Sequence, residues 1–151
     1  MGSLNSSGVA TATSTNFHDI GATTITAHFN GNAIEAAVSG SQPLTINGDA
    51  TTTTLILPKT SASVGTSVSI GASVFDTTLS HAVTYGNVTF YANSTPIGVA
   101  VLSSSSPSTT IQTSSLPVGS YTITARFNGN ATEAVSTSTG QTLTIVSATL
   151  P

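Results

Sequence analysis

Residues 119–145 read GSYTITARFNGNATEAVSTSTGQTLTI, and residues 21–46 read GATTITAHFNGNAIEAAVSGSQPLTI, so one block is written twice. The offset between equivalent residues is 98 at Phe127 and 99 at Leu143. The later copy therefore holds one more residue, which we place in the loop between its two strands. A self-similarity at about the length of one small domain is typical of a tandem array.

The repeated block alternates apolar and polar residues. In the earlier copy Ile25, Ala27 and Phe29 fall on one face, and Thr and His residues fall on the other. Period two over this length indicates a half-buried β-strand. The AsnGlyAsn at 30–32 ends this strand, because Asn and Gly tolerate positive φ.

Further alternating segments precede the later copy and complete a domain. With the two strands of that copy they give seven predicted strands, at residues 51–57, 67–75, 86–91, 97–102, 109–114, 121–127 and 141–146. Seven short strands separated by Gly, Pro, Asn and Ser turns are typical of an immunoglobulin-like β-sandwich, so we predict an all-β fold. The predicted structural core is Leu55, Leu57, Val68, Ile70, Val74, Val88, Phe90, Leu116, Tyr121, Ile123, Phe127, Leu143 and Ile145.

Tyr121 stands at the start of the sixth predicted strand, directly after the turn at 116–120. This is the place for a tyrosine corner, whose hydroxyl bonds to backbone a few residues upstream. The equivalent residue of the earlier copy is Thr23, which is too short to reach. We therefore expect the earlier copy to be held less firmly.

The chain resembles the bacterial Ig-like domains of group 3. The resemblance rests on TTTTL at 51–55, VG at 64–65, GNVTFY at 86–91, PIGVAVL at 96–102, LPVGSYTITA at 116–125 and FNGNA at 127–131. Such domains often carry Asp where Asn32 and Asn130 stand. The resemblance implies a sandwich found in tandem in large secreted and surface proteins, and it implies no particular activity.

The predicted organisation is a partial module at residues 1–47, a complete one at 48–148, and a tail or the start of a next repeat at 149–151. The partial module supplies only the last three strands, of which residues 9–17 are the first. Its apolar face would be open to water unless it is covered. Residues that precede this piece in a longer exported chain could complete it, two such halves could pair across a two-fold axis, or another surface or chain could cover it.

Composition excludes several classes of partner. Charged residues make up 5% of the chain, against about 25% in ordinary domains, and Ser and Thr make up about a third. With only Lys59 and Arg126 as fixed cations, we expect no nucleic-acid partner. We expect no membrane insertion, because no apolar run approaches 18 residues. The absence of cysteine excludes disulfides and thiolate chemistry.

The side chains able to do chemistry show no shared motif. His18, His28 and His81 have no common ligand spacing, so we expect solvated histidines and no metal or cofactor. The five acids, Asp19, Glu35, Asp49, Asp76 and Glu133, fall at turns and strand ends, and we expect no enzyme. Two further hypotheses are a Lys–Asn or Thr–Gln side-chain cross-link, involving Lys59 or Gln141, and a Thr-lined face that binds ice or sugar.

The function expected from the sequence is architectural. We expect a non-catalytic spacer of a bacterial extracellular or cell-surface protein, in an adhesin stalk or a filament, with neighbouring Ig-like repeats as partners. Self-association through residues 1–47 is a second expected contact. The alternative is a recognition module that binds glycan or protein through end loops or an exposed strand edge.

Overall fold

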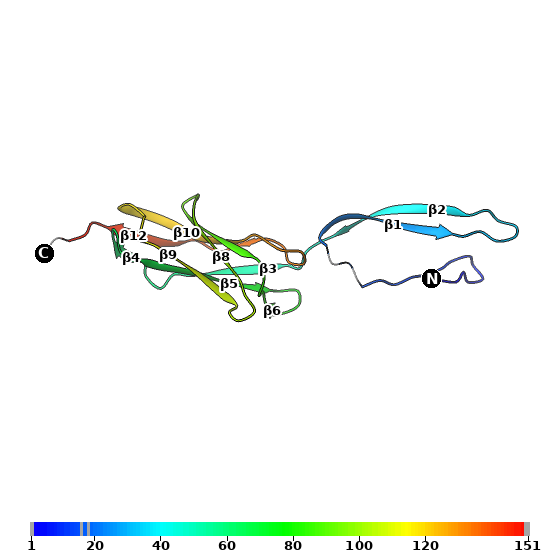
Figure 1. Cartoon of the computed structure of the whole chain (residues 1–151), viewed down its shortest axis with the longest axis horizontal. Helices are drawn as coiled ribbons and strands as arrows, with labels where there is room; N and C mark the ends of the chain where they lie inside the picture. Colours follow the sequence, from blue (N-terminus) through cyan, green and yellow to red (C-terminus); the bar gives the residue numbers. More distant parts are fainter. Residues whose placement is uncertain (1, 16, 18, 150–151) are drawn as a thin grey trace. The chain divides into compact units, whose positions relative to one another are not determined.

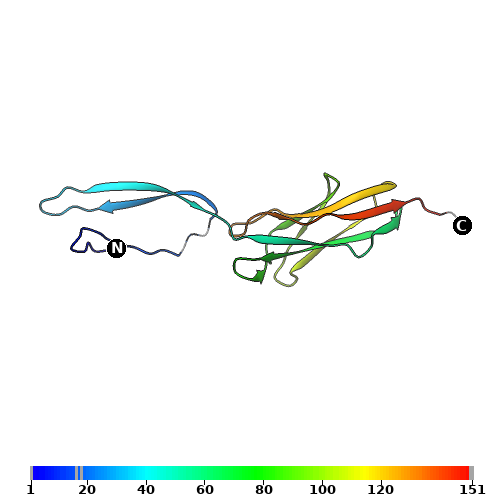
Figure 2. The same cartoon turned by 180° about the vertical axis from the view of Figure 1, so that it is seen from behind.

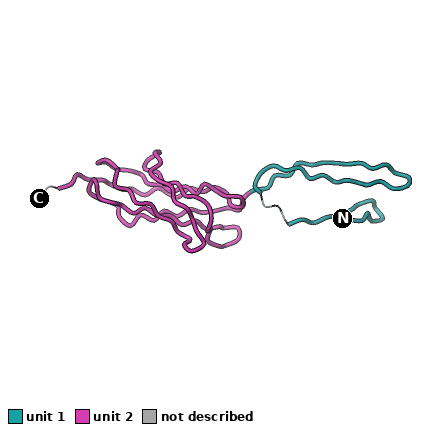
Figure 3. Tube along the Cα trace, viewed as in Figure 1, with its two compact units in different colours: residues 1–47 teal, residues 48–151 magenta. Residues whose placement is uncertain are grey.

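The computed structural model describes residues 2–15, 17 and 19–149, and these residues form strands and turns without a helix. The chain divides into two compact units, residues 1–47 (unit 1) and residues 48–151 (unit 2), coloured separately in Figure 3. The all-β class predicted from the sequence is confirmed.

Unit 2 is a sandwich of two sheets (Figures 1 and 2). One sheet has the strand order β4-β12-β10-β7-β8, with β11 also paired to β10, and the other has the order β3-β5-β6, with β9 paired to β5. The seven longer strands overlap the seven predicted ones, and β4, β6 and β11 are short additions. The bounds are β3 Thr51–Ile56, β4 Ser61–Ser63, β5 Val68–Asp76, β6 His81–Ala82, β7 Asn87–Ala92, β8 Thr95–Val101, β9 Ser108–Thr113, β10 Gly119–Phe127, β11 Ser136–Thr137 and β12 Gln141–Val146.

The core of unit 2 is one cluster of apolar side chains contributed by both sheets. The predicted residues buried in it are Leu55, Val68, Ile70, Val74, Val88, Phe90, Ile123, Phe127, Leu143 and Ile145. Three predicted residues, Leu57, Leu116 and Tyr121, are only partly buried and pack against the cluster. The cluster also contains Ala72, Val83, Ala92, Leu102 and Ala125, which the predicted set lacked.

The tyrosine corner expected at Tyr121 is present. Its hydroxyl donates a hydrogen bond of 2.9 Å to the backbone carbonyl of Pro117. The bond ties the segment that enters β10 to the strand itself, so the crossover into the six-stranded sheet is fixed at this corner.

Unit 1 is built on a hairpin of β1 (Gly21–Phe29) and β2 (Val38–Ile46), which pair from Gly21↔Ile46 to Phe29↔Val38. The strand predicted at residues 9–17 is wrong, because the described residues of that stretch form no strand. The equivalent strand of unit 2, β9, gains its backbone bonds from β5. No counterpart of β5 exists among the described residues of unit 1, so the segment has no ladder to join.

The extra residue of the later copy lies within the strand pairing, not in the loop as predicted. Ile123 pairs with Gln141 and Arg126 pairs with Thr137, so residues 138–140 oppose residues 124–125. Three residues facing two is a β-bulge. In the hairpin of unit 1 the same stretch is paired without interruption.

Candidate functional site

Hydrogen bonds to two turns hold residues 49–50, where the chain enters unit 2. The backbone N–H of Asp49 donates to Thr132 O at 2.8 Å, and the N–H of Ala134 donates to Asp49 O at 2.9 Å. The next residue, Ala50, accepts a bond of 2.8 Å from the N–H of Thr77 through its carbonyl. We call this end of the sandwich the entry pole: residues 49–50, the turn at 77–80 and the loop at 128–135.

The loop of the entry pole is shaped by Asn130. Its Oδ1 accepts hydrogen bonds from the N–H groups of Thr132 (2.9 Å) and Glu133 (2.8 Å). Gly129 has φ of 76°, which suits glycine. The Asn130 side-chain amide donates to Tyr85 O at 3.2 Å, and Glu133 is thereby held at the inner side of the loop, 9% exposed.

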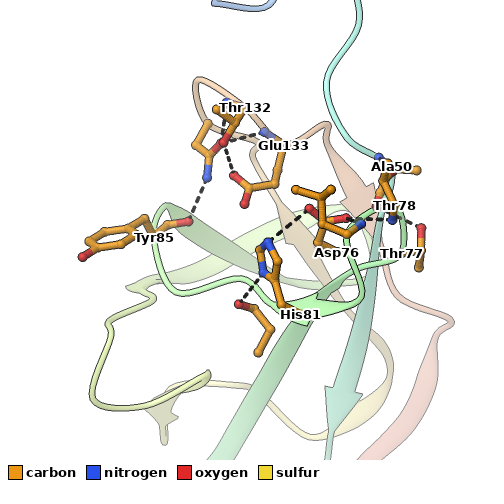
Figure 4. Close-up of polar contacts among 11 residues, drawn as sticks. Ala50, Asp76, Thr77, Thr78, His81, Tyr85, Thr132 and Glu133 are labelled. Carbon is orange, nitrogen blue, oxygen red and sulfur yellow. Dashed lines mark hydrogen bonds and ion pairs between the residues drawn. The ribbon is translucent and has the colours of Figure 1, made fainter. Parts of the chain in front are cut away.

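Three side chains that can bind a proton or a metal ion meet at this pole. They are Asp76 at the end of β5, His81 at the start of β6, and Glu133 in the loop, and their ligand atoms all lie within 4.8 Å of one another. Figure 4 shows the His81 ring beside the Asp76 carboxylate, with the Glu133 carboxylate pointing toward it. We call these residues the carboxylate–histidine cluster.

The Asp76 carboxylate is fully buried and uses its two oxygens differently. Oδ1 accepts hydrogen bonds from the N–H groups of Thr78 (2.7 Å) and Leu79 (2.9 Å), which fixes the β5–β6 turn. Oδ2 has no hydrogen-bond partner and lies 3.6 Å from His81 Nε2. An orphaned buried carboxylate oxygen is costly, so its surroundings are unusual for a side chain that serves only a turn.

The sequence did not reveal this cluster. From the sequence we expected His81 to be solvated and the two acids to lie at turns and strand ends, and the His81 side chain is half exposed. Asp76 and His81 face each other because β5 and β6 are paired at these residues. Glu133 is 52 residues beyond His81 and lies in a loop of the other sheet. No local spacing in the sequence could therefore have shown that the two side chains lie close together.

Among the residues that the structure describes, the other candidate residues contribute no ligand atom to the cluster. His28 is on β1, where its Nδ1 bonds with Ser39 Oγ at 2.6 Å, and His18 lies outside the described residues. The Glu35 carboxylate accepts a hydrogen bond from the side chain of Asn32. Asp49 enters the entry pole through its backbone.

The cross-link hypothesis stays a prediction in its Lys–Asn form at Lys59, and in its Thr–Gln form the side chains have other hydrogen-bond partners. The Gln141 amide donates to the backbone carbonyl of Leu55 at 3.2 Å. The hydroxyls of Thr51 and Thr53 bond instead with Ser136 Oγ, at 2.8 and 2.7 Å. These bonds hold β3 against β11.

A family model of the bacterial Ig-like domain (group 3) matches residues 53–146, which span the sandwich from β3 to β12. The chain belongs to this family. A comparison with curated proteins finds no match. As a bacterial Ig-like domain the chain is of a structural and surface class that is generally non-catalytic. Among the residues that the structure describes, no helix is long and apolar enough to span a bilayer.

Proposed function

We propose that the chain is a mechanical spacer, a non-catalytic link in a string of Ig-like domains of a bacterial extracellular or cell-surface protein. The observation that supports the proposal is the pairing of β12, the last strand of unit 2, with β4, the short strand that follows β3. β12 runs parallel to β4, with Thr144↔Ser61, Ile145↔Ala62 and Val146↔Ser63 in register.

The chain enters and leaves unit 2 at opposite ends of β5. Thr51, at the start of β3, pairs with Asp76, the last residue of β5. Ile145, near the end of β12, lines a small cleft together with Val68, the first residue of β5. A pull on the two ends of unit 2 therefore acts along its strands.

Parallel strands such as β4 and β12, pulled from opposite ends, are loaded in shear. The N–H of Val64 donates to Val146 O at 2.8 Å, and the N–H of Thr144 donates to Thr60 O at 2.9 Å. These bonds lie across the pulling direction, so they must break together rather than one after another. Shear loading of this pair favours a module that resists extension.

Single-molecule force spectroscopy with handles at the two ends tests the proposal. We expect one sharp rupture for unit 2, releasing about 30 nm of chain. Val64→Pro deletes an N–H of the β4–β12 pair and should lower the rupture force. Ser104→Pro is the matched control, because Ser104 follows Ser103, whose carbonyl accepts from Ser106 N–H, and proline suits that turn position. Equal rupture forces for both variants would contradict the proposal.

Recognition of glycan or protein stays the alternative. Unit 1 offers a groove of about 590 Å³, lined by the apolar residues Leu4, Ala10, Ala27, Phe29 and Val38 among others. Specific retention of the intact chain on a glycan array at micromolar concentration would favour this alternative. Sedimentation of the same protein tests self-association through residues 1–47, since a strict monomer excludes a pairing of two such halves.

A further inference from the structure

We propose that the carboxylate–histidine cluster is a binding site for a divalent d-block cation, Zn²⁺ above all. The three protein ligands are Asp76 Oδ2, His81 Nε2 and a carboxylate oxygen of Glu133, and water completes the coordination. A bound ion would cross-link the two sheets of the sandwich. The proposed spacer function does not require such a site.

The buried carboxylate of Asp76 is the first argument. The side chain is 0% exposed, and Oδ1 is fully used by the two backbone N–H groups of the turn. Oδ2 points at the cluster without a hydrogen-bond donor. A buried anionic oxygen in that position calls for a cation, because hydration is denied to it.

The orientation of His81 is the second argument. Its Nδ1 lies 3.1 Å from the carbonyl of Ala82, and a carbonyl can only accept, so Nδ1 carries the proton. Nε2 is then the ring nitrogen that faces the cluster, 3.6 Å from Asp76 Oδ2. A separation of 3.6 Å is too long for a hydrogen bond between these two atoms, and both can be ligands of one cation. Ligands of a tetrahedral Zn²⁺ stand about 3.3 Å apart, close to the spacing seen.

Each ligand is also held by a second contact. Backbone N–H groups fix Asp76, the Ala82 carbonyl fixes His81, and the Thr132 hydroxyl donates to Glu133 Oε2 at 2.7 Å. Outer contacts of this kind orient metal ligands in known sites. In unit 1 the equivalent Glu35 bonds back to Asn32 instead, so its carboxylate is occupied within its own loop.

The donor set selects the metal. One imidazole nitrogen and two carboxylate oxygens suit Zn²⁺ and its d-block neighbours, whereas Ca²⁺ takes six to eight oxygen ligands. The two carboxylates balance the charge of a divalent ion. β5 and β6 belong to one sheet, and Glu133 lies between β10 and β11 of the other. A bound ion would therefore join the two sheets at the entry pole.

Calorimetric titration of the tag-free chain with Zn²⁺, Ca²⁺ and Mg²⁺ tests the site. His81→Gln and Glu133→Gln each remove one ligand, and both side chains are replaceable without emptying the core. Their matched controls are His28→Gln and Glu35→Gln, which remove a histidine and the repeat-equivalent glutamate from unit 1. Co²⁺ in place of Zn²⁺ gives a visible spectrum that reports a nitrogen–oxygen coordination shell.

We expect one Zn²⁺ per chain, a weakening of at least about tenfold in each ligand variant, and no more than about twofold change in the controls. Saturating Zn²⁺ should raise the melting temperature of unit 2 by about 5 °C or more, and not in the ligand variants. Absence of Zn²⁺ binding, preference for Ca²⁺ or Mg²⁺, or equal binding by ligand variants and controls would overturn the proposal. Circular dichroism confirms that each variant is folded before its affinity is used.

Discussion

The two copies of the repeated block share their sequence but differ in burial. Ile25 of β1 is 44% exposed, and its equivalent Ile123 of β10 is 0% exposed. Leu44 and Leu143 differ in the same way, at 37% and 0%. The later copy is covered because β7 pairs with β10 and β5 and β3 supply the facing sheet. A closely similar pair of strands is therefore buried or exposed according to its neighbours.

The local geometry of the FNGN loop is nevertheless the same in the two copies. Gly31 and Gly129 have φ of 79° and 76°. Asn32 Oδ1 accepts from the N–H groups two and three residues ahead, at 2.8 Å each, as Asn130 Oδ1 does in unit 2. Turn geometry follows from the FNGN sequence alone, whereas burial follows from segments distant in the chain.

The largest expected difference between the copies concerns their phenylalanines. Phe127→Ala should lower the free energy of unfolding of unit 2 by about 3–5 kcal/mol, because Phe127 is fully buried. Phe29→Ala should lower the free energy of unfolding by less than about 1 kcal/mol, because Phe29 is only partly buried and the other residues of β1 are exposed. Urea titration followed by circular dichroism measures both. Equal losses of unfolding free energy would mean that Phe29 is buried in a core as Phe127 is.

Loss of the bulge contact should be the next largest effect. Ser138 Oγ accepts a hydrogen bond of 3.0 Å from the buried N–H of Ala125. Ser138→Ala leaves that N–H without its acceptor and should destabilise unit 2 by about 1–3 kcal/mol. Thr139→Ala, at an exposed neighbour, is the control and should change stability by less than about 0.5 kcal/mol. Thermal unfolding compares the two variants. Similar melting temperatures would contradict the view that the Ser138 hydrogen bond at the bulge stabilises unit 2.

The tyrosine corner should give a smaller effect. Tyr121→Phe removes the hydrogen bond to Pro117 O and should cost about 0.5–1.5 kcal/mol. Thr23→Val, the equivalent change in unit 1, should leave stability unchanged within about 0.5 kcal/mol. Chemical unfolding of both variants measures the difference. A Tyr121→Phe protein as stable as the wild type would show that the corner does not fasten β10.

The smallest expected effect is local and common to both copies. Asn130→Ala and Asn32→Ala each remove the side-chain acceptor of a loop, at a global cost of about 1 kcal/mol or less. Amide exchange at residues 132–133 and 34–35 should accelerate in the respective variants. Acceleration in only one copy would contradict the view that the loop sequence sets its own geometry.

The sequence was most informative where a residue's role depends on near neighbours. Alternation predicted β10, and the turn before Tyr121 predicted its corner, because both signals lie within a few residues. The family resemblance was also confirmed, over residues 53–146.

The sequence was least informative where the structure of a segment depends on segments distant in the chain. Residues 9–17 alternate weakly, as a strand does, yet they lack the partner that β5 provides in unit 2. The proximity of Glu133 to His81 depends on how the two sheets stack, and Asp76 is buried in the same sandwich. The offset between the copies shows that the later one has an extra residue, but it does not show where that residue lies. Its position in the bulge at 138–140 depends on the pairing register of the strands.

The most direct test of the central claim, that one sequence block becomes core only where the front strands cover it, is residue-resolved amide hydrogen exchange in the intact chain. We expect the amides of Ile123, Ala125 and Phe127 to exchange only through global unfolding of unit 2. The equivalent amides of Ile25, Ala27 and Phe29 should exchange at least about a hundredfold faster. Equal protection of the two sets would contradict the account.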